Sequence, residues 1–358
     1  AYEIASCLVG SEMCIRDNFR LIHSAQHQLT CWVPVMSALS LHDLYLARQR
    51  IHGLVRNTPL ELSPSLSRRL GTPVYLKLEA LQTTGSFKLR GASNAIAVLS
   101  AEQRACGVVT ASTGNHGRAV AHAAAQLGVK ATVFLSQLVP ANKVQAIRDL
   151  GAEVCVIGHS QDDAQQAAQQ HAEQQGATLI PPFDHPQVIA GQGTLGLEII
   201  EQLPEVEQVL IPLSGGGLFA GVALAMKSIK PAITTHGISM QRGAAMYASL
   251  QAGKPVEVEE LPTLADSLGG GIGLGNQHTL SMTQRLLDHL HLLPEASIAN
   301  GMRHAYQHER LVLEGAGAVG IAALLDGLVT ARGPVVVVVS GRNVDSAQHQ
   351  RVINGGDA

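Results

Sequence analysis

Aromatic and charged residues are both scarce in this sequence of 358 residues. Phe, Trp and Tyr make up 3% of the chain, and Asp, Glu, Lys and Arg together make up 15%. The net charge is −3, so the basic excess expected of a nucleic-acid-binding protein is missing. Hydrophobic residues reach 46%, which excludes a disordered chain and allows a large core. The 36 glycines favour a close-packed α/β sheet protein with tight turns.

Cysteine pairs and long hydrophobic runs are also missing. The cysteines form no C-x-x-C pair and their number is odd, which indicates free thiols in a reducing cytosol. They are Cys7, Cys14, Cys31, Cys106 and Cys155. No apolar run approaches the ~18–20 residues of a membrane span, and the densest, Val335 to Val339, has the length of a strand. We therefore expect a cytoplasmic protein with neither a membrane nor a nucleic acid as partner.

Residues 1–36 differ in character from the rest of the chain. Glu3 and Glu12 surround a weak apolar patch, and the basic start of a signal peptide is absent. We expect this N-terminal extension to lie outside the fold. The recognisable protein begins near Leu39, where Leu41, Leu44 and Ile51 recur at helical spacing.

Runs of Val and Ile that are typical of buried parallel strands alternate with helical segments along the remainder. The sequence predicts strands at 74–78, 107–110, 131–135, 153–157, 209–212, 235–239 and 335–339. It predicts helices at 87–99, 119–127, 143–150, 162–175 and 218–227. The expected fold class is α/β with mostly parallel sheets. Because no Pro/Ser-rich linker marks a boundary, two domains would have to be interwoven.

Three loops place small or polar residues at the carboxyl end of a predicted strand, where open α/β sheets bind ligands. They span residues 84–91, 110–117 and 213–218. In the third, Gly215, Gly216 and Gly217 let backbone N–H groups converge on an anion at a helix N-terminus. A dinucleotide site would need an acid about 20 positions on, and no Asp or Glu occurs from Gln208 to Val256. The turn therefore predicts a site for a single phosphate; a purely structural turn is the alternative.

Lys88 lies between small residues and an aromatic one, with Gly85 and Ser86 before it and Phe87 beside it. A lone Lys near a helix start is usually a solvated side chain. In these surroundings it would instead be partly desolvated, which lowers its pKa and makes it a Schiff-base nucleophile. Pyridoxal phosphate (PLP) needs such a lysine together with a phosphate cradle.

Four motifs in order give a resemblance to the threonine/serine dehydratase family of fold-type II PLP enzymes. They are Ser86-Phe87-Lys88-x-Arg90-Gly91-Ala92, Ser112-Thr113-Gly114-Asn115-His116-Gly117, Ser214-Gly215-Gly216-Gly217 and Ser340-Gly341-Arg342-Asn343. The resemblance covers about residues 40–350. Within the family, the segments 265–273 and 240–247 most resemble dehydratases of hydroxyectoine utilisation.

The resemblance implies a fold like that of the tryptophan synthase β chain, with two interwoven, open, twisted, mostly parallel sheets flanked by helices. A large PLP-binding domain would comprise residues 37–106 and 186–358, and a small domain residues 107–185. A homodimer or homotetramer is implied.

The resemblance also assigns roles. Lys88 would bond to the cofactor and later remove the α-proton, and Phe87 would pack near the ring. Asn115 would bond to the ring's phenolic oxygen, and Ser340 would face the pyridine nitrogen. The cofactor phosphate would be bound by Ser214, Gly215, Gly216, Gly217 and Leu218. The substrate carboxylate would be held by Ser112, Thr113, Gly114, Asn115 and His116.

A hydroxyl at the pyridine nitrogen has a mechanistic consequence. A carboxylate would keep that nitrogen protonated, whereas Ser340 leaves it neutral, so a carbanion is less delocalised. Expelling a β-substituent then relieves the charge better than transamination does. The expected reaction removes the β-hydroxyl of a threonine- or serine-like amino acid and gives a 2-oxo acid and ammonia. The subgroup resemblance implies a substrate derived from hydroxyectoine.

We predict no metal site. Relatives that bind a divalent cation carry two acids where this sequence has Ser239 and Ala245. The 16 histidines include the pairs His289/His291 and His304/His308, but no spacing completes a zinc motif.

Two alternatives to a dehydratase stay open. An amino acid racemase of the serine racemase type needs an acid/base on the face opposite Lys88, and Thr113 is the candidate. A non-catalytic PLP-binding protein is the other, although it would not need to keep Lys88, Asn115 and Ser340 together.

Overall fold

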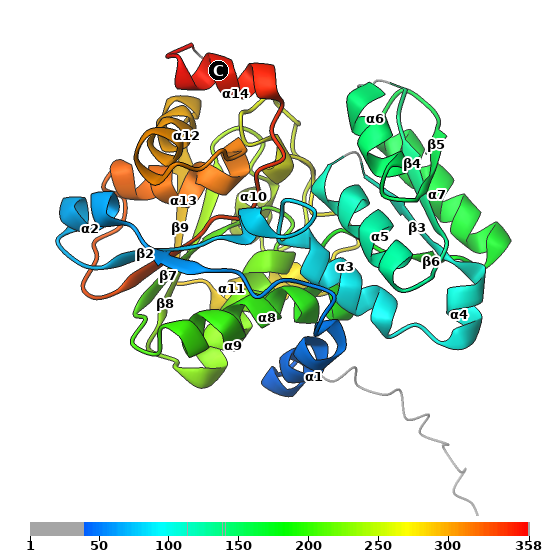
Figure 1. The fold of residues 1–358 in the computed structure, drawn as a ribbon, viewed down its shortest axis with the longest axis horizontal. Helices are drawn as coiled ribbons and strands as arrows, with labels where there is room; N and C mark the ends of the chain where they lie inside the picture. The colour runs from blue at the N-terminus through cyan, green and yellow to red at the C-terminus, as the bar shows by residue number, and fades with distance from the viewer. Residues whose placement is uncertain (1–38, 113, 138, 140, 357–358) are drawn as a thin grey trace, which may run out of the picture. The chain divides into compact units, whose positions relative to one another are not determined.

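Two β-sheets, each covered by helices on both faces, build the part of the chain that the structure describes (Figure 1). The structure is a computed structural model that describes residues 39–112, 114–137, 139 and 141–356. The predicted extension at residues 1–36 lies outside these residues. The α/β fold class and the two mostly parallel sheets predicted from the sequence are confirmed.

The larger sheet has the strand order β1-β2-β10-β7-β8-β9, and all its pairs are parallel except β1 with β2. Its strands are β1 (Leu60–Leu62), β2 (Val74–Lys77), β7 (Gln208–Pro212), β8 (Thr234–Met240), β9 (His289–Leu293) and β10 (Val335–Val338). Four consecutive valines make β10, which lies in the middle of the sheet and is buried on both faces. This burial explains why its sequence shows no polar alternation.

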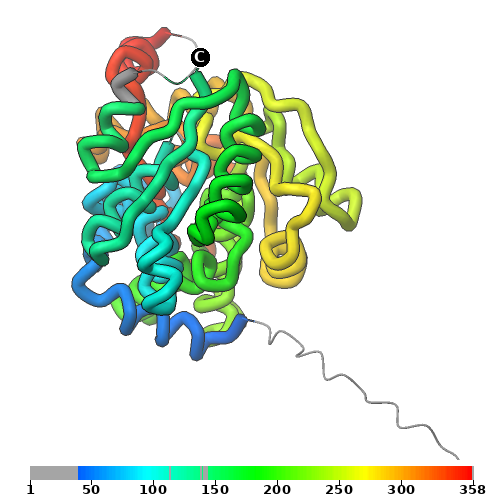
Figure 2. The backbone as a smooth tube through the Cα atoms, turned by 90° about the vertical axis from the view of Figure 1, so that its right-hand side faces the viewer, coloured from blue at the N-terminus to red at the C-terminus, as the bar shows by residue number. Residues whose placement is uncertain are grey.

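The two faces of the larger sheet are covered by different helices. Val336 and Val338 pack in one core, with α1 (Leu41–Ile51), α8 (Pro186–Gln202), α9 (Gly217–Ile229), α10 (Ala245–Ala252) and α11 (Thr279–Leu286). Val335 and Val337 pack in the other core, with α2 (Pro64–Leu70), α12 (Glu295–Glu309) and α13 (Gly315–Leu325). Both views place α1 and the C-terminal α14 (Ser346–Ile353) at opposite ends of this unit (Figures 1 and 2).

The smaller sheet is entirely parallel, in the order β5-β4-β3-β6. Its strands are β3 (Val108–Ala111), β4 (Ala131–Leu135), β5 (Glu153–Val156) and β6 (Thr178–Leu179). One face packs against α3 (Lys88–Ala97), α5 (Asn115–Gln126) and α6 (Ala141–Arg148), and the other against α7 (Gln161–Gln175). Helix α4 (Ala101–Cys106) leads from α3 into β3. The domain boundaries at 107 and 185 stay a prediction.

A buried group of four charges joins β2, the short 3-10 turn at Glu79–Leu81, α3 and α8. Arg90 binds Glu79 at 2.8 Å and Glu198 at 2.6 Å, and Lys77 binds Glu198 at 2.6 Å. Burial disfavours ionisation of Glu79, but the adjacent Arg90 outweighs it and holds the pKa of Glu79 below its usual value. We call these four side chains the buried charge cluster. It fixes the helix that starts at Lys88 to the larger sheet.

Most predicted strands and helices are present with ends shifted by a few residues. The largest shift is in α5, which begins at Asn115 rather than at 119. Gly117, which looked like part of a turn, lies inside this helix. A Cβ there would lie 2.2 Å from the Ser112 carbonyl oxygen, so only glycine fits. The sequence-based prediction missed α8, whose Gly191, Gly193 and Gly196 were not taken as helical.

No helix of the described residues is long and apolar enough to cross a membrane. Cys106 and Cys155 are free thiols, and the other three cysteines lie outside the described residues.

Candidate active site

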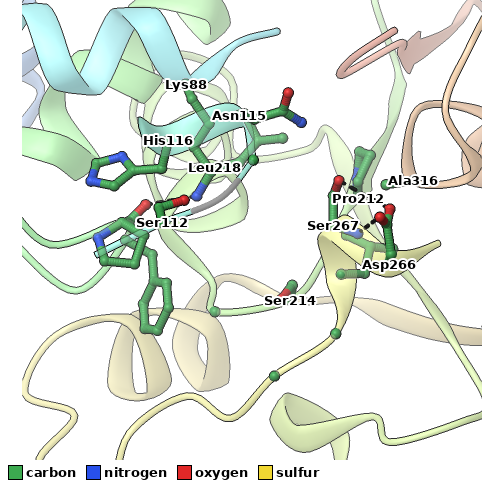
Figure 3. Close-up of a pocket in the computed structure, with 18 of the residues that line it drawn as sticks. Lys88, Ser112, Asn115, His116, Pro212, Ser214, Leu218, Asp266, Ser267 and Ala316 are labelled. Atoms are coloured by element: carbon green, nitrogen blue, oxygen red, sulfur yellow. Dashed lines mark hydrogen bonds between the residues drawn. The ribbon is translucent and has the colours of Figure 1, made fainter. Parts of the chain in front are cut away.

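A cavity of about 540 Å³ opens at the carboxyl ends of β3, β7 and β10. Figure 3 shows Lys88, Asn115 and His116 on one side of it, with Asp266 and Ser267 opposite. The three loops singled out in the sequence all contribute to its lining. Residues from both sheets thus meet in one cavity, which is where parallel sheets place ligands.

Lys88 is the first residue of α3, and its amino group reaches the cavity. The Nζ atom donates a hydrogen bond of 2.7 Å to the Pro182 carbonyl and lies 5.3 Å from the centre of the Phe87 ring. Burial lowers the pKa of Lys88 to about 8, although the nearby charge of Glu314 acts in the opposite direction. A substantial fraction of this amine is therefore neutral at mildly alkaline pH, as a Schiff-base nucleophile requires.

The glycine turn connects β7 to α9 and lines the same cavity as Lys88. Gly216 has a φ of +88°, and Gly217 is the first residue of the 13-residue helix α9. A Cβ at Gly215 would lie 2.3 Å from the Phe183 ring, so no side chain fits there. Ser214 and Leu218 border the turn in the cavity wall. Backbone N–H groups at this helix start form a phosphate cradle.

The turn before α5 brings Ser112, Gly114 and Asn115 to the cavity wall, whereas Thr113 lies outside the described residues. The Asn115 amide donates to Glu314 at 2.8 Å, and its oxygen accepts from Asn343. This side chain is therefore fixed on both sides before any ligand binds.

His116 lies in the cavity wall, and its ring is neutral at physiological pH. Burial and the adjacent Lys88 lower the pKa of His116 to about 3. Its Nε2 lies 2.8 Å from the Ile180 carbonyl, so Nε2 carries the proton, and Nδ1 has no hydrogen-bond partner among the described residues. The neutral ring therefore offers no second donor. An anion at this turn would be held by the backbone N–H groups of the first turn of α5.

Ser340 follows β10 and is buried in the cavity wall. Its hydroxyl donates weakly to the Ala316 carbonyl, at 3.3 Å. The role that the resemblance assigns to this hydroxyl, at the ring nitrogen, stays a prediction.

The sequence-based prediction gave no role to Glu314, which the structure places in the cavity wall. One carboxylate oxygen accepts from Asn115, and the other lies 3.3 Å from the Ser267 hydroxyl. A Cβ at Gly341 would lie 2.0 Å from Glu314, so the glycine of the fourth motif makes room for this carboxylate. A usable signal was present, because Glu314 is the single acid directly before the uncharged helix α13.

A second omission is the segment after β6, residues 180–184. Besides the contacts of Ile180, Pro182 and Phe183 described above, the Asp184 carboxylate accepts from the backbone N–H groups of Gln277, His278 and Thr279 at the start of α11. Only the Pro-Pro pair at 181–182 marked this segment in the sequence, and it indicates a turn without indicating a site.

The residues present fit PLP. Phe183 occupies the space that side chains at Gly215 and Gly217 would need. The phosphate cradle that these glycines form shares its cavity with Lys88, whose amine is partly neutral. Ser340 offers a polar atom without charge. At the two positions linked to cation binding, Ser239 is buried within β8 and Ala245 begins α10. Searching the described residues reveals no group of three or more His, Cys, Asp or Glu placed to hold a metal ion.

The comparison with known families and proteins agrees with this geometry. The pyridoxal-phosphate-dependent enzyme family matches residues 51–341. A provisionally assigned threonine dehydratase of Sinorhizobium fredii is 57% identical over 89% of this chain and 97% of its own. The L-threonine ammonia-lyase of Thermotoga maritima is 42% identical over 89% of this chain and 79% of its own.

Solved structures show the same fold. Maize serine racemase superposes with a TM-score of 0.83 at 33% identity, covering 88% of this chain and 97% of that one. A threonine deaminase of Solanum lycopersicum gives 0.81 at 36% identity, covering 88% of both chains. The chain belongs to the family of PLP-dependent enzymes, and within it to the threonine/serine dehydratase group. It is a lyase that uses PLP.

Proposed function

We propose that the protein eliminates water from a β-hydroxy amino acid of the threonine or serine type. The released enamine then takes up one water and is hydrolysed to a 2-oxo acid and ammonia. The observation that carries this proposal is the position of the Lys88 amine, which shares one cavity with the glycine turn and has a pKa of about 8. Bound PLP supplies an electron sink for the bond that breaks at the substrate's α-carbon.

Lys88 is the group that takes the α-proton in this proposal. A base works best when its pKa is near the working pH, and burial brings the lysine into that range. The Pro182 carbonyl accepts a hydrogen bond from Nζ and holds it on the wall of the cavity. The amine is thereby both partly neutral and oriented.

The remaining residues bind and orient. The N–H groups of the glycine turn hold a phosphate, and the first turn of α5 offers N–H groups to the substrate carboxylate. Asn115, fixed by Glu314 and Asn343, would orient the ring through its phenolic oxygen. Ser340 leaves the pyridine nitrogen without a carboxylate, which favours loss of the β-hydroxyl over transamination.

The cavity wall opposite Lys88 indicates which substrate side chain the site would bind. Glu260 and Asp266 belong to its lining there. The Ser267 backbone N–H donates to Asp266 at 2.8 Å. A hydroxylated amino acid with a second, cationic nitrogen would meet these carboxylates, which supports a hydroxyectoine-derived substrate as the finer form of the proposal.

The test is a panel of β-hydroxy amino acids, assayed for ammonia and 2-oxo acid with the PLP-loaded enzyme. Threonine, serine and a β-hydroxylated diamino acid are the necessary members. Release of both products in equal amounts from any of them supports the proposal. If none of the panel yields 2-oxo acid while PLP is covalently bound, the proposal is wrong.

Racemisation is the second candidate, because the likeness to maize serine racemase extends over 88% of the chain. Chiral analysis of the amino acid left in the same reactions separates the two activities. Exchange between L and D forms that outpaces release of 2-oxo acid would favour the racemase. A cytoplasmic homodimer or homotetramer remains part of the proposal, and sedimentation of the holoenzyme measures its mass.

A further inference from the structure

Three histidines gather on one face of the larger sheet, away from the active site. His236 on β8 is the register partner of His289 on β9, and His291 follows two residues later on the same face. The His236 ring lies 5.0 Å from the His289 ring and 5.4 Å from the His291 ring, and both pairs are stacked. In the sequence, His289 and His291 were noted only as a pair that completes no zinc motif, and His236 was not singled out.

These rings line a second cavity, of about 390 Å³. Gln208, Thr234 and His289 each begin a strand of the sheet, so the cavity lies at the amino ends of β7, β8 and β9, which are neighbours in Figure 1. The active site lies at the opposite, carboxyl ends. The full lining is Gln208, Thr234, His236, His289, His291, Leu328, Thr330 and Arg332. This set holds hydrogen-bond donors and a guanidinium, and no carboxylate belongs to it.

A chain of hydrogen bonds fixes which ring nitrogens carry protons. The Gln208 amide nitrogen donates to the Thr330 carbonyl at 3.2 Å, so its oxygen accepts from His236 Nε2, also at 3.2 Å. The neutral His236 ring then has a lone pair at Nδ1, which accepts from His291 Nε2 at 3.1 Å. His291 Nδ1 is then the one ring nitrogen of the pair that carries neither a proton nor a hydrogen bond from another described residue. The two rings together can therefore take up one further proton, and His291 receives it.

The nearby carboxylates are not placed to neutralise the positive charge of that proton. The Asp288 carboxylate already accepts from Lys227 Nζ at 2.6 Å and from the Thr235 backbone and hydroxyl at 2.8 and 3.0 Å. Glu207 lies against Gly333, where a Cβ would be 2.2 Å from its carboxylate. In the described part of the chain, Arg332 has no ion pair or hydrogen bond. Burial and the neighbouring imidazoles lower the pKa of His236 to about 4 and outweigh the charge of Asp288, which acts in the opposite direction.

We propose that this cavity is a binding site for a tetrahedral oxyanion, phosphate or sulfate in class, held by Arg332, the threonine hydroxyls and a protonated His236/His291 pair. A dianion would supply the charge that the cavity lacks. Because the pair must be protonated to bind it, affinity falls as pH rises through neutrality. The site is independent of catalysis, since no residue of its lining belongs to the active-site cavity.

Calorimetric titration of the PLP-loaded enzyme with sulfate tests the site. Bound cofactor occupies the phosphate cradle, and sulfate keeps its charge between pH 6 and pH 8, so a change in affinity reports on the protein. We expect saturable binding at pH 6 with proton uptake, and binding at least tenfold weaker at pH 8. Equal affinity at both pH values, or no saturable binding at pH 6, would overturn the proposal.

Two variants locate the site. Arg332→Gln changes an exposed side chain and His291→Asn a half-buried one, and each should weaken sulfate binding at least tenfold while leaving the lyase rate unchanged. His308→Asn is the matched control, because the His308 ring also lies next to another histidine ring, that of His304, with 4.6 Å between the ring centres, but on α12. Wild-type affinity in both site variants contradicts the assignment. Glycerol phosphate, compared with inorganic phosphate, distinguishes an anion carried on a larger molecule from the free ion.

Discussion

The Lys88 amine has one hydrogen-bond partner among the described residues, the Pro182 carbonyl, and its surroundings act on its pKa in opposite directions. Burial favours the neutral form and Glu314 favours the ammonium, with a pKa of about 8 as the result. The Pro182 carbonyl fixes the nitrogen 2.7 Å away without adding charge. A lysine in these surroundings can bond to an aldehyde and can also act as a base.

Replacing this lysine tests its role directly. Lys88→Ala should lose the yellow chromophore that borohydride fixes to the wild-type protein, because no amine remains to bond to PLP. Its lyase rate should fall by at least about 10³-fold, since both the bond and the base are removed. Mass spectrometry of the reduced protein locates the adduct. A covalent adduct on another lysine in Lys88→Ala would contradict the assignment.

Ser340 tests the argument about the ring nitrogen. Ser340→Asp should keep that nitrogen protonated and raise transamination relative to elimination, because the carbanion becomes more delocalised. The ratio of the two products is the measurement, with Ser340→Thr as the control that keeps a hydroxyl. An unchanged ratio in Ser340→Asp would show that this side chain does not face the nitrogen.

The sequence indicated the residues that carry recognisable chemistry at fixed spacing. Lys88 beside small residues and the Gly215–Gly217 turn could be interpreted from their neighbours alone. Glu314 could not, because its function depends on Asn115, 199 positions away, and on the space left by Gly341. The roles assigned to Asn115 and Ser340 stay predictions.

At the scale of elements, the buried charge cluster ties α8 to α3 and β2. Glu198 accepts from both Lys77 and Arg90, so its removal leaves two buried cations with only Glu79. Glu198→Gln should lower the free energy of unfolding by about 3–5 kcal/mol, the usual cost of an uncompensated buried charge.

Chemical denaturation of the two proteins measures this difference. Glu201→Gln on the same helix is the control, because its pair with Arg48 is exposed and should contribute less than about 1 kcal/mol. A loss in Glu198→Gln no larger than in the control would show that the cluster does not stabilise the fold.

The sequence predicted elements best where their pattern was strong and continuous. The valine run at β10 and the Ala/Gln run at α7 were both found. No helix was predicted at α8, whose three glycines lower its helical propensity. Gly191, Gly193 and Gly196 are instead the places where neighbouring helices come closest, with Cβ positions 2.5 to 2.7 Å from Arg90, Leu44 and Ala225. Such contacts are set by tertiary packing, which local propensity does not contain.

For the molecule as a whole, we predict lyase activity without a divalent cation. Hard cations need several oxygen ligands, usually including carboxylates, and neither Ser239 nor Ala245 provides a carboxylate. The holoenzyme, dialysed against EDTA, should keep its rate and melting temperature within about 20% and 1 °C of the values with added Mg²⁺ or Ca²⁺. A several-fold recovery of rate on adding metal would show the prediction wrong.

Stability should fall below neutral pH because the protein buries neutral histidines. The pKa of His116 is about 3 and that of His236 about 4, against 6.5 for an ordinary histidine. Between these values the unfolded chain binds more protons, so stability is present above pH 6.5 and is lost as pH falls toward 4. From pH 7.5 to pH 5, His116 alone accounts for about 2 kcal/mol, and the more exposed His236 for less.

Denaturant unfolding of the holoenzyme at the two pH values, in buffers free of sulfate and phosphate, measures this loss. His236→Gln should reduce the pH dependence, and the exposed His308→Asn should not. Equal stability at pH 7.5 and pH 5 would contradict the buried neutral state of both rings.

The packing of Phe183 against the glycine turn also restricts how this protein can change over evolutionary time. A Cβ at Gly215 would lie 2.3 Å from the Phe183 ring, and one at Gly217 would lie 3.0 Å from the Phe183 backbone. A larger residue at 215 is therefore admitted only after Phe183 becomes smaller, and a smaller residue at 183 alone leaves a void beneath the phosphate cradle. Positions 183 and 215 are 32 residues apart in the chain, yet substitutions at them are expected to be inherited as a pair.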